Sequence, residues 1–404
     1  DIEWGNHDIL WMGAACGNGA CIANVIRNNL RHNNTEVLES GYGISMRSLT
    51  LFAENMYDKQ DPMEAAAKAI SVIMLKLEGQ LIKAHPEYGM NDRLLLDKMD
   101  VKTGHVIWEG IKYSLNDNDF PTVDPKDPYT LTEEEKAVMK ELRAAFLNSA
   151  QLQKHVKFLY EKGSMYRVFN GNLLYHGCIP FDAHGKFDRM EFDGKVYQGK
   201  AYLDYADSMA REAFLKKTPE AVDFMWFLWS GRKSPLCGRN IRTFERMFLD
   251  DERTWREESN PYYKFYHQEE VCNMILGEFG LHSETSHIVN GHTPVKTMEG
   301  EQPIRANGKL MVIDGGFCKD YHEKTGIAGY TLIYNSHHLA LAQHKPYELA
   351  KQDFSKNAPT MQIVEIMPRR LTVGDTDNGK QVAQQIEELT ELLKAYRNGE
   401  IKEK

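Results

Sequence analysis

The stretch DIEWGNHD, residues 1–8, places three polar side chains of different chemistry directly after an apolar, strand-like run. Gly5 allows the backbone to turn sharply where the strand ends. Asn6, His7 and Asp8 then follow the carboxyl end of that strand, where α/β sheets usually place ligand chemistry. Asn supplies a carbonyl oxygen to a hard metal ion, His supplies a proton donor, and Asp can hold an imidazole in one tautomer. Taken alone, the stretch is explained equally well by a strand-to-helix turn in which Asn and Asp are cap residues.

The composition limits the classes of function. The chain has 404 residues, 42% of them hydrophobic and 26% charged, which is ordinary for a globular protein of two or three domains. The formal net charge of −9 argues against nucleic acid as the main partner, because the phosphate backbone requires a basic surface. The six cysteines form no CxxC pair, and no apolar run is long enough to span a bilayer. We therefore expect a cytoplasmic protein whose partner is a small molecule rather than nucleic acid or a membrane; its oligomeric state stays open, a homo-oligomer included.

The sequence predicts a helical block between regions that contain strands. Asp61 followed by Pro62 is a helix start, and His85 followed by a proline ends that helix. Thr132 and Glu135 form a capping box for a long amphipathic helix that ends near residue 163. The other expected elements are an apolar helix from residue 9 to about residue 30, strands at 173–175, 287–290, 310–313 and 330–334, a Trp-rich strand at 224–229, a hairpin of 363–367 with 370–373, and a terminal helix from about residue 379.

Three short strands end in the same way, in a histidine next to a glycine. The first is followed by GNHD (residues 5–8), the second by His176-Gly177 and the third by Gly291-His292. Strands that end at the same edge of a sheet bring such residues together despite their separation in sequence. Two imidazoles and one amide oxygen make most of a first-row metal site. One such histidine is usually a half-buried structural residue, but three with this pattern favour a metal site.

The three motifs resemble those of the calcineurin-like metallophosphoesterases, whose series includes GNH[DE], a strand-borne HG and a later GH. The resemblance is closer to the class III fructose-1,6-bisphosphatases of bacteria. It includes the segments WGNHDILWMGAA (residues 4–15), LWSGRKSPL (228–236) and VNGHTPV (289–295), and it extends over essentially the whole chain.

The resemblance implies a role for each matching residue. Asn6, His176 and His292 would bind one ion of a two-metal centre, with manganese as the usual metal of the family. His7 would act as the general acid toward the leaving oxygen, held and charged by Asp8. The ions would clamp the phosphoryl oxygens and lower the pKa of a water, so that hydroxide attacks phosphorus in line.

The chain also departs from the family pattern. The family motifs GDxHG and GDxxDRG, which hold the ligands of the other ion and the bridging aspartate, are absent from this sequence. The late motif Gly291-His292-Thr293-Pro294 lacks a second histidine. The resemblance therefore implies a fragment without the N-terminal part of the enzyme, and we expect this chain alone to be inactive.

The fold implied by the resemblance is α/β, a metallophosphoesterase-type β-sandwich flanked by helices, incomplete at its start and with a large helical insertion. Residues 1–34 would belong to the catalytic core and residues 35–165 to the insertion. Residues 166–345 would complete the core, and residues 346–404 would form a C-terminal hairpin and a helix packed on the core.

Four basic residues are candidates for binding the phosphates of the substrate, and each is explained about as well by a solvated basic loop. They follow the Trp-rich run and are Arg232, Lys233, Arg239 and Arg242. His184-Gly185 repeats the HG pair in a polar turn rather than at a strand end, so it is not a candidate.

The expected function is the hydrolysis of fructose 1,6-bisphosphate to fructose 6-phosphate in gluconeogenesis. Two alternatives stay open: a Ser/Thr protein phosphatase that uses the same chemistry, and a non-catalytic binding module. Activity on a phosphopeptide would identify the first alternative. The second predicts no gain of activity when the upstream motifs are restored.

Overall fold

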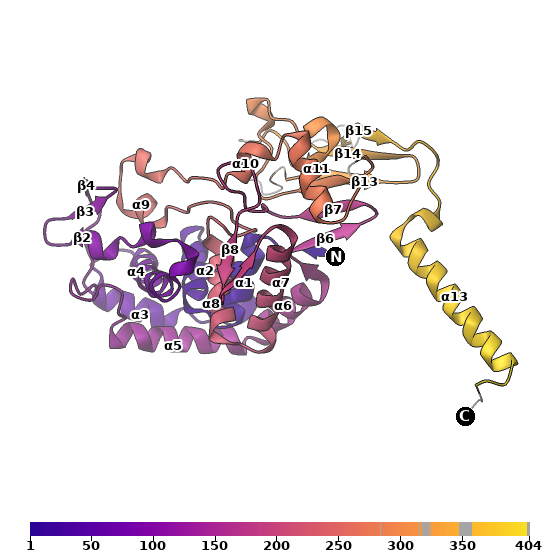
Figure 1. The fold of residues 1–404 in the computed structure, drawn as a ribbon. Coiled ribbons are helices and arrows are strands. Elements are labelled where there is room, and N and C mark those ends of the chain that lie inside the picture. The colour runs from indigo at the N-terminus through magenta and orange to yellow at the C-terminus, as the bar shows by residue number, and fades with distance from the viewer. Residues whose placement is uncertain (283, 315, 317–322, 324, 347–357, 402–404) are drawn as a thin grey trace. The chain divides into compact units, whose positions relative to one another are not determined.

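The structure is a computed structural model that describes the whole chain except residues 283, 315, 317–322, 324, 347–357 and 402–404. Cys318 and part of the predicted 346–404 segment therefore lie outside the described residues. Helices and strands form two compact units (Figure 1), the first made of residues 1–166 and 176–265 and the second of residues 167–175 and 266–404. The prediction of a mixed α/β fold is confirmed.

The first unit is mainly helical, and its N-terminal helix lies in the core in contact with four other helices. Its helices are α1 (Asn6–Ala15), α2 (Gly19–Arg31), α3 (Arg47–Met56), α4 (Pro62–Ala84), α5 (Glu133–Asn148), α6 (Ala150–Lys162), α7 (Gly199–Leu215), α8 (Pro219–Ser230), α9 (Thr243–Phe248) and α10 (Tyr262–Phe265). Its strands are β1 (Ile2–Glu3) paired with β5 (Gly163–Ser164), β2 (Met99–Asp100) with β3 (His105–Trp108) and β4 (Ile111–Ser114), and β8 (Met190–Phe192) with β9 (Lys195–Tyr197).

Explicit capping chemistry identified the helix starts correctly. The Asp61 side chain accepts a hydrogen bond from the Met63 N–H at the start of α4, and Thr132 and Glu135 form the predicted capping box at the start of α5. The predicted long helix after that box is nevertheless two helices, because Ser149 ends α5 in an extended conformation and caps α6 through its hydroxyl.

The predicted single apolar helix after residue 8 is also two helices, α1 and α2, which meet at an angle of 120°. Gly17 adopts a positive φ of 91° at the break, a conformation that favours glycine. The Asn18 side chain then accepts from the Cys21 N–H and starts α2. The apolar pattern continues through the break, so periodicity alone did not locate it.

The Trp-rich run 224–229 was interpreted as a strand, and this prediction is wrong. The run lies in α8, which begins at Pro219. Phe224, Trp226 and Leu228 are buried along with the residues between them, so the helix is enclosed by protein on most sides. An apolar run without polar breaks has the same composition in a buried helix as in a buried strand.

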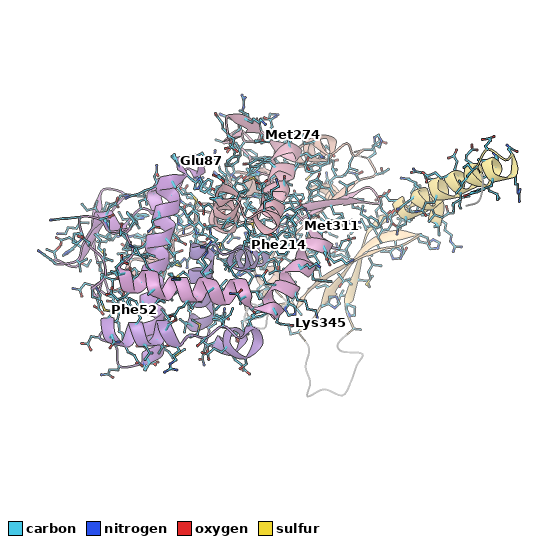
Figure 2. The ribbon with its side chains drawn as sticks, turned by 90° about the horizontal axis from the view of Figure 1, so that it is seen from below. Phe52, Glu87, Phe214, Met274, Met311 and Lys345 are labelled. Atoms are coloured by element: carbon cyan, nitrogen blue, oxygen red, sulfur yellow. The ribbon has the colours of Figure 1, made fainter. Side chains whose placement is uncertain are left out.

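The second unit contains two sheets joined by an apolar core. The first is β6 (Tyr166–Phe169), β7 (Asn172–Tyr175), β10 (His287–Asn290), β11 (Ile304–Arg305) and β12 (Leu310–Val312), in the order β11-β12-β10-β7-β6; the second is β13 (Gly329–Tyr334), β14 (His338–His344) and β15 (Thr360–Ile366). Val289 of β10, Met311 of β12 and Leu339 of β14 form a common buried cluster, and Met311 is labelled in Figure 2. α11 (Glu269–Glu278) packs on the first sheet.

Two predictions of strand pairing need correction. β15 pairs with β14, not with residues 370–373, which lie beyond Pro368 and form no strand.

The strands before the three histidine motifs do not all share one sheet: β7 and β10 are parallel neighbours, whereas β1 pairs with β5. β7 and β10 end in register, with Tyr175 opposite Asn290.

The terminal helix α13 (Asp377–Arg397) is present where the sequence predicted a helix. Thr376 caps its start through a bond from the Gly379 N–H, close to the expected position. Gly379 is the buried residue of the helix, and the apolar residues that follow it are exposed. The packing of this segment on the core stays a prediction.

Two further features concern the compartment. Cys16, Cys21, Cys178, Cys237 and Cys272 are buried free thiols. In the described part of the chain no single helix has the length and apolar composition to cross a bilayer; α1 and α2 meet that criterion only as a bent pair.

His85, at the end of α4, gives a prediction for stability against pH. Its Nε2 lies 3.1 Å from Asp223 Oδ2 and its Nδ1 lies 2.9 Å from Glu87 Oε1, and the hydrogen bond with Asp223 is the main cause of its raised pKa. A raised pKa in the folded state means that this contribution is complete below the unfolded pKa of about 6.5 and is lost as pH rises through the folded pKa. We expect wild type to lose about 1 kcal/mol relative to His85→Gln over that rise in pH, measured by urea denaturation. Identical pH profiles for the two proteins would contradict the assignment.

Candidate active site

The start of the chain is fixed by Trp4, whose side chain is fully buried. The Trp4 Nε1–H donates to the Leu159 carbonyl oxygen at 2.8 Å, and the Trp4 N–H donates to the Ser164 oxygen at 2.9 Å. A β-carbon at Gly163 would overlap the Trp4 ring, so the glycine leaves space for it. These contacts place the following residues, Gly5 to Asp8, at a defined position.

The Asp8 side chain forms a hydrogen bond with the backbone at the start of α1. Its Oδ2 accepts a hydrogen bond of 2.8 Å from the Gly5 N–H and so closes the start of α1. Within the described residues no hydrogen bond joins Asp8 to His7. Asp8 therefore acts on His7 through the charge of its carboxylate and not through a hydrogen bond.

His176 lies against the backbone of Gly5. Its Nε2 donates to Asn6 Oδ1 across 3.2 Å, which brings together two of the three predicted metal ligands. A β-carbon at Gly5 would lie 3.0 Å from His176 Cε1, 3.2 Å from Nδ1 and 3.3 Å from Nε2. Burial, and to a lesser extent the nearby His7, lowers the pKa of His176 to about 4. The imidazole is therefore neutral near pH 7, the form that binds metal ions.

His7 contacts an aromatic ring that sequence reasoning did not single out. The His7 and Trp229 rings meet edge to face with centroids 5.1 Å apart. Desolvation lowers the pKa of His7, and the Asp8 carboxylate opposes that shift without reversing it. Trp229 lies in the segment LWSGRKSPL, whose resemblance to the family was the one signal available for it.

The close packing of the backbone around Gly177 explains why a glycine follows His176. A β-carbon at this position would overlap the carbonyl oxygen of Pro235 and would lie 2.9 Å from that of Leu236. The next residue, Cys178, donates its N–H to the same Pro235 oxygen at 2.8 Å. Three segments that are distant in sequence, 4–8, 176–178 and 229–236, therefore meet in the first unit.

His292, the third predicted ligand, belongs to the second unit. It follows β10 and Gly291 and is half-buried, with a backbone φ of 67°. A left-handed conformation is uncommon for a residue with a side chain, and such positions concentrate at functional sites. Val295, just beyond it, donates to the carbonyl oxygen of Asp314, whose carboxyl has a pKa raised by burial.

The residues present match part of a metal centre. Neutral His176 and the Asn6 oxygen are suitable donors, and they lie side by side. Among the described residues, no three His, Cys, Asp or Glu side chains are grouped so that they could hold a metal ion. The set Asn6, His176 and His292 draws on both units, and its joint role stays a prediction.

The basic residues predicted to bind phosphate already have partners within the protein. Arg232 lies 3.0 Å from Glu258, and Lys233 lies 2.8 Å from Asp188; both basic side chains are partly exposed. Arg239 pairs through its backbone with Ser259. Their role toward phosphate stays a prediction.

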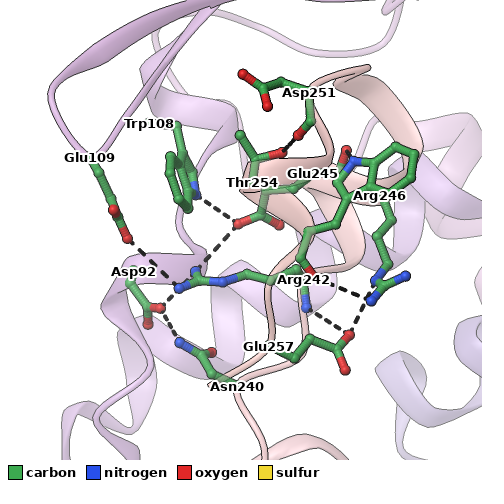
Figure 3. A network of polar contacts seen from close by, with 11 residues as sticks. Asp92, Trp108, Glu109, Asn240, Arg242, Glu245, Arg246, Asp251, Thr254 and Glu257 are labelled. Atoms are coloured by element: carbon green, nitrogen blue, oxygen red, sulfur yellow. Dashed lines mark hydrogen bonds and ion pairs between the residues drawn. The ribbon is translucent and has the colours of Figure 1, made fainter. Parts of the chain in front are cut away.

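Arg242 is enclosed in a network of carboxylates, shown in Figure 3. Its side chain is 6% exposed, and its Nη1 lies 2.9 Å from Asp92 Oδ2 and 3.3 Å from Glu245 Oε1. Trp108 donates its indole N–H to the same Glu245 oxygen at 2.9 Å and stacks under the guanidinium. These contacts give Arg242 a structural role at the start of α9, and a phosphate could approach it only by displacing a carboxylate.

Comparison with known proteins identifies the family. The model of the Firmicute fructose-1,6-bisphosphatase family matches residues 1–398. The chain belongs to this family. It is 49% identical to the class 3 fructose-1,6-bisphosphatase of Clostridium novyi (strain NT) and 48% identical to that of Clostridium tetani (strain Massachusetts / E88), with 100% of the chain and 65% of each relative covered. The chain thus spans 65% of the length of these relatives. No solved structure matches the chain.

The contact between Gly5 and His176 gives a prediction for this family member. Gly5→Ala should shift the His176 ring by a few tenths of an ångström and weaken metal binding at the predicted Asn6–His176–His292 site about tenfold, the scale seen when the support of a metal ligand is disturbed. The backbone of Gly5 (φ −93°, ψ 168°) suits alanine, so the fold should be retained. Titration calorimetry with Mn²⁺ measures the effect. Gly19→Ala, whose β-carbon would meet its nearest neighbour at 3.4 Å, is the matched control, and equal affinities for the two variants would contradict the prediction.

Proposed function

We propose that this protein hydrolyses fructose 1,6-bisphosphate to fructose 6-phosphate and phosphate, as a cytoplasmic enzyme of gluconeogenesis. The observation that carries the proposal is the meeting of His176, Asn6 and His7 around Gly5, from motifs 170 positions apart in the chain. Membership of the Firmicute fructose-1,6-bisphosphatase family supports the choice of substrate.

Asn6, His176 and His292 are the proposed ligands of one metal ion in a metallophosphoesterase-type sandwich. Two findings support this set: β7 and β10, which lead to His176 and His292, are parallel neighbours that end in register, and His176 is neutral. A pair of ions, manganese in the related family, would supply charge neutralisation of the phosphoryl group and a water of lowered pKa.

The remaining chemistry belongs to the protein. His7 is the proposed general acid and carries its proton to the leaving oxygen, with its ring oriented by contact with Trp229. The Asp8 carboxylate favours the protonated form of His7 through its charge. Arg232 and Lys233, which follow α8, are proposed to bind substrate phosphates because their side chains are partly exposed, in contrast to the buried Arg242.

The test is phosphate release from fructose 1,6-bisphosphate with Mn²⁺. We compare the 404-residue chain alone with the same chain joined to an upstream segment of a relative that carries the GDxHG and GDxxDRG motifs. We expect release only from the joined protein, since those motifs supply the remaining ligands in the family that the sequence resembles. A phosphopeptide serves as the alternative substrate and should not be hydrolysed.

Three outcomes would contradict parts of this proposal. Hydrolysis of the phosphopeptide in preference to the sugar bisphosphate would favour a protein phosphatase. No release from either substrate by the joined protein would favour a binding module. Robust turnover by the 404-residue chain alone, abolished by His292→Ala, would show that carboxylates within this chain complete the metal centre.

A further inference from the structure

The apolar side chains of α13 follow a seven-residue repeat. Val382, Ile386, Leu389, Leu393 and Tyr396 alternate in steps of four and three residues, which places them on one stripe of the helix. Each of these side chains is between 42% and 64% exposed. Exposed Leu392 lies beside this stripe, and an apolar stripe of this width with a four-three spacing fits the seam between two helices.

The charges of α13 lie away from this stripe. Gln384 donates to Glu388 at 2.8 Å, and Lys394 pairs with Glu391 at 3.1 Å, so these polar pairs occupy the outward face. The positions that flank the stripe carry a single charge in 21 residues; they are Ala383, Gln385, Thr390, Leu392 and Arg397. Flanking residues select the partner in paired helices, and like charges there prevent self-pairing. This helix can therefore meet an identical helix without repulsion along the seam.

We propose that α13 pairs with α13 of a second copy of this chain, with the five apolar residues of the stripe forming the seam between the two helices. The extent of the stripe supports the pairing, because from Val382 to Tyr396 it covers two seven-residue repeats of the 21-residue helix. A single exposed helix of this length is marginal in water, whereas two such helices bury each other's apolar stripe. The proposal concerns assembly and does not depend on the proposed activity.

The test is the mass of the 404-residue protein in solution, measured by size-exclusion chromatography with light scattering across a dilution series. We expect the mass of two chains for wild type and of one chain for Leu389→Glu, which places a charge in the middle of the seam and keeps a good helix former. Gln381→Glu adds the same charge on the outward face and should keep the mass of two chains. Ile386→Glu should behave as Leu389→Glu does.

Hydrogen exchange gives a second measurement that needs no variant. Amides of α13 should be protected in concentrated wild type and lose protection on dilution, and in Leu389→Glu they should exchange fast at every concentration. A one-chain mass for wild type throughout the series would overturn the proposal. So would a two-chain mass for Leu389→Glu, because another surface would then join the copies. A one-chain mass together with protected α13 amides in the chain joined to the upstream segment of a relative would also overturn it, since that segment would then cover the stripe.

Discussion

Replacing His176 with alanine is expected to lower phosphate release from fructose 1,6-bisphosphate on the order of 10³-fold in the chain joined to the upstream segment of a relative. The imidazole is neutral, lies against Gly5 and shares a hydrogen bond of 3.2 Å with Asn6, so its loss removes one proposed ligand and the support of another. A bound metal ion supplies several kcal/mol of charge stabilisation, and each loss of about 1.4 kcal/mol lowers the rate tenfold. Steady-state phosphate release at saturating Mn²⁺ measures the effect.

The same chain offers a matched control in its second His-Gly pair. His184 is exposed in a turn, where its N–H donates to the Asp182 side chain. His184→Ala should therefore keep wild-type activity and manganese affinity. If His176→Ala kept more than about a tenth of the wild-type rate, equivalent to a loss below roughly 1.4 kcal/mol, the ligand assignment would fail.

Lys76→Met is expected to destabilise the first unit by about 3 to 5 kcal/mol, because it leaves the carboxylate of Glu135 buried without its partner. Lys76 Nζ lies 2.7 Å from Glu135 Oε2 and 2.6 Å from the Thr122 oxygen, and both charged side chains are completely buried. Glu135 also accepts the Thr132 N–H in the capping box of α5, so the pair joins α4 to the start of that helix. Urea denaturation followed by tryptophan fluorescence measures the loss.

Two further variants separate the buried charge from lost packing. Glu135→Gln removes the charge but keeps an acceptor for the capping bond, so the double variant with Lys76→Met should recover part of the loss. Lys136→Met removes an exposed lysine, 2.7 Å from Glu133, and should change stability by less than about 0.5 kcal/mol. Equal losses for Lys76→Met and Lys136→Met would contradict the role of burial.

The features of the fold that sequence reasoning identified correctly depend on local chemistry. Asp61 and the Thr132–Glu135 box act within one turn of their own helices, so their meaning does not depend on the rest of the chain. The breaks at Gly17 and Ser149 were missed because apolar periodicity continues through both of them.

Longer-range features were harder to predict. The run 224–229 is apolar at every position because α8 is enclosed by protein, and such a run carries no period that distinguishes a helix from a strand. β15 pairs with β14 across an intervening segment, whereas the prediction chose the nearest candidate strand. Pairing of this kind depends on the tertiary fold.

Some contacts of the candidate site could be predicted from the sequence, and others could not. The strand-Gly-His pattern predicted that Asn6 and His176 meet, and the structure places them in contact. Trp229 beside His7 and Pro235 against Gly177 could not be predicted, because both contacts depend on how the end of α8 packs. The burial of Arg242 among carboxylates was equally invisible in a sequence where it reads as one more basic residue.

The pairing of β7 with β10 has a consequence during synthesis. Asn172 of β7 leaves the ribosome long before its partner His287 of β10, and the residues between them build much of the first unit. β7, with its buried Leu173, can pair with β6 as soon as both are made, but its other edge has no partner until β10 is synthesised. Non-local pairing of this kind makes folding slow and exposes strand edges to other nascent chains. We therefore expect that the yield of native protein depends on translation rate and on chaperones that bind extended apolar segments.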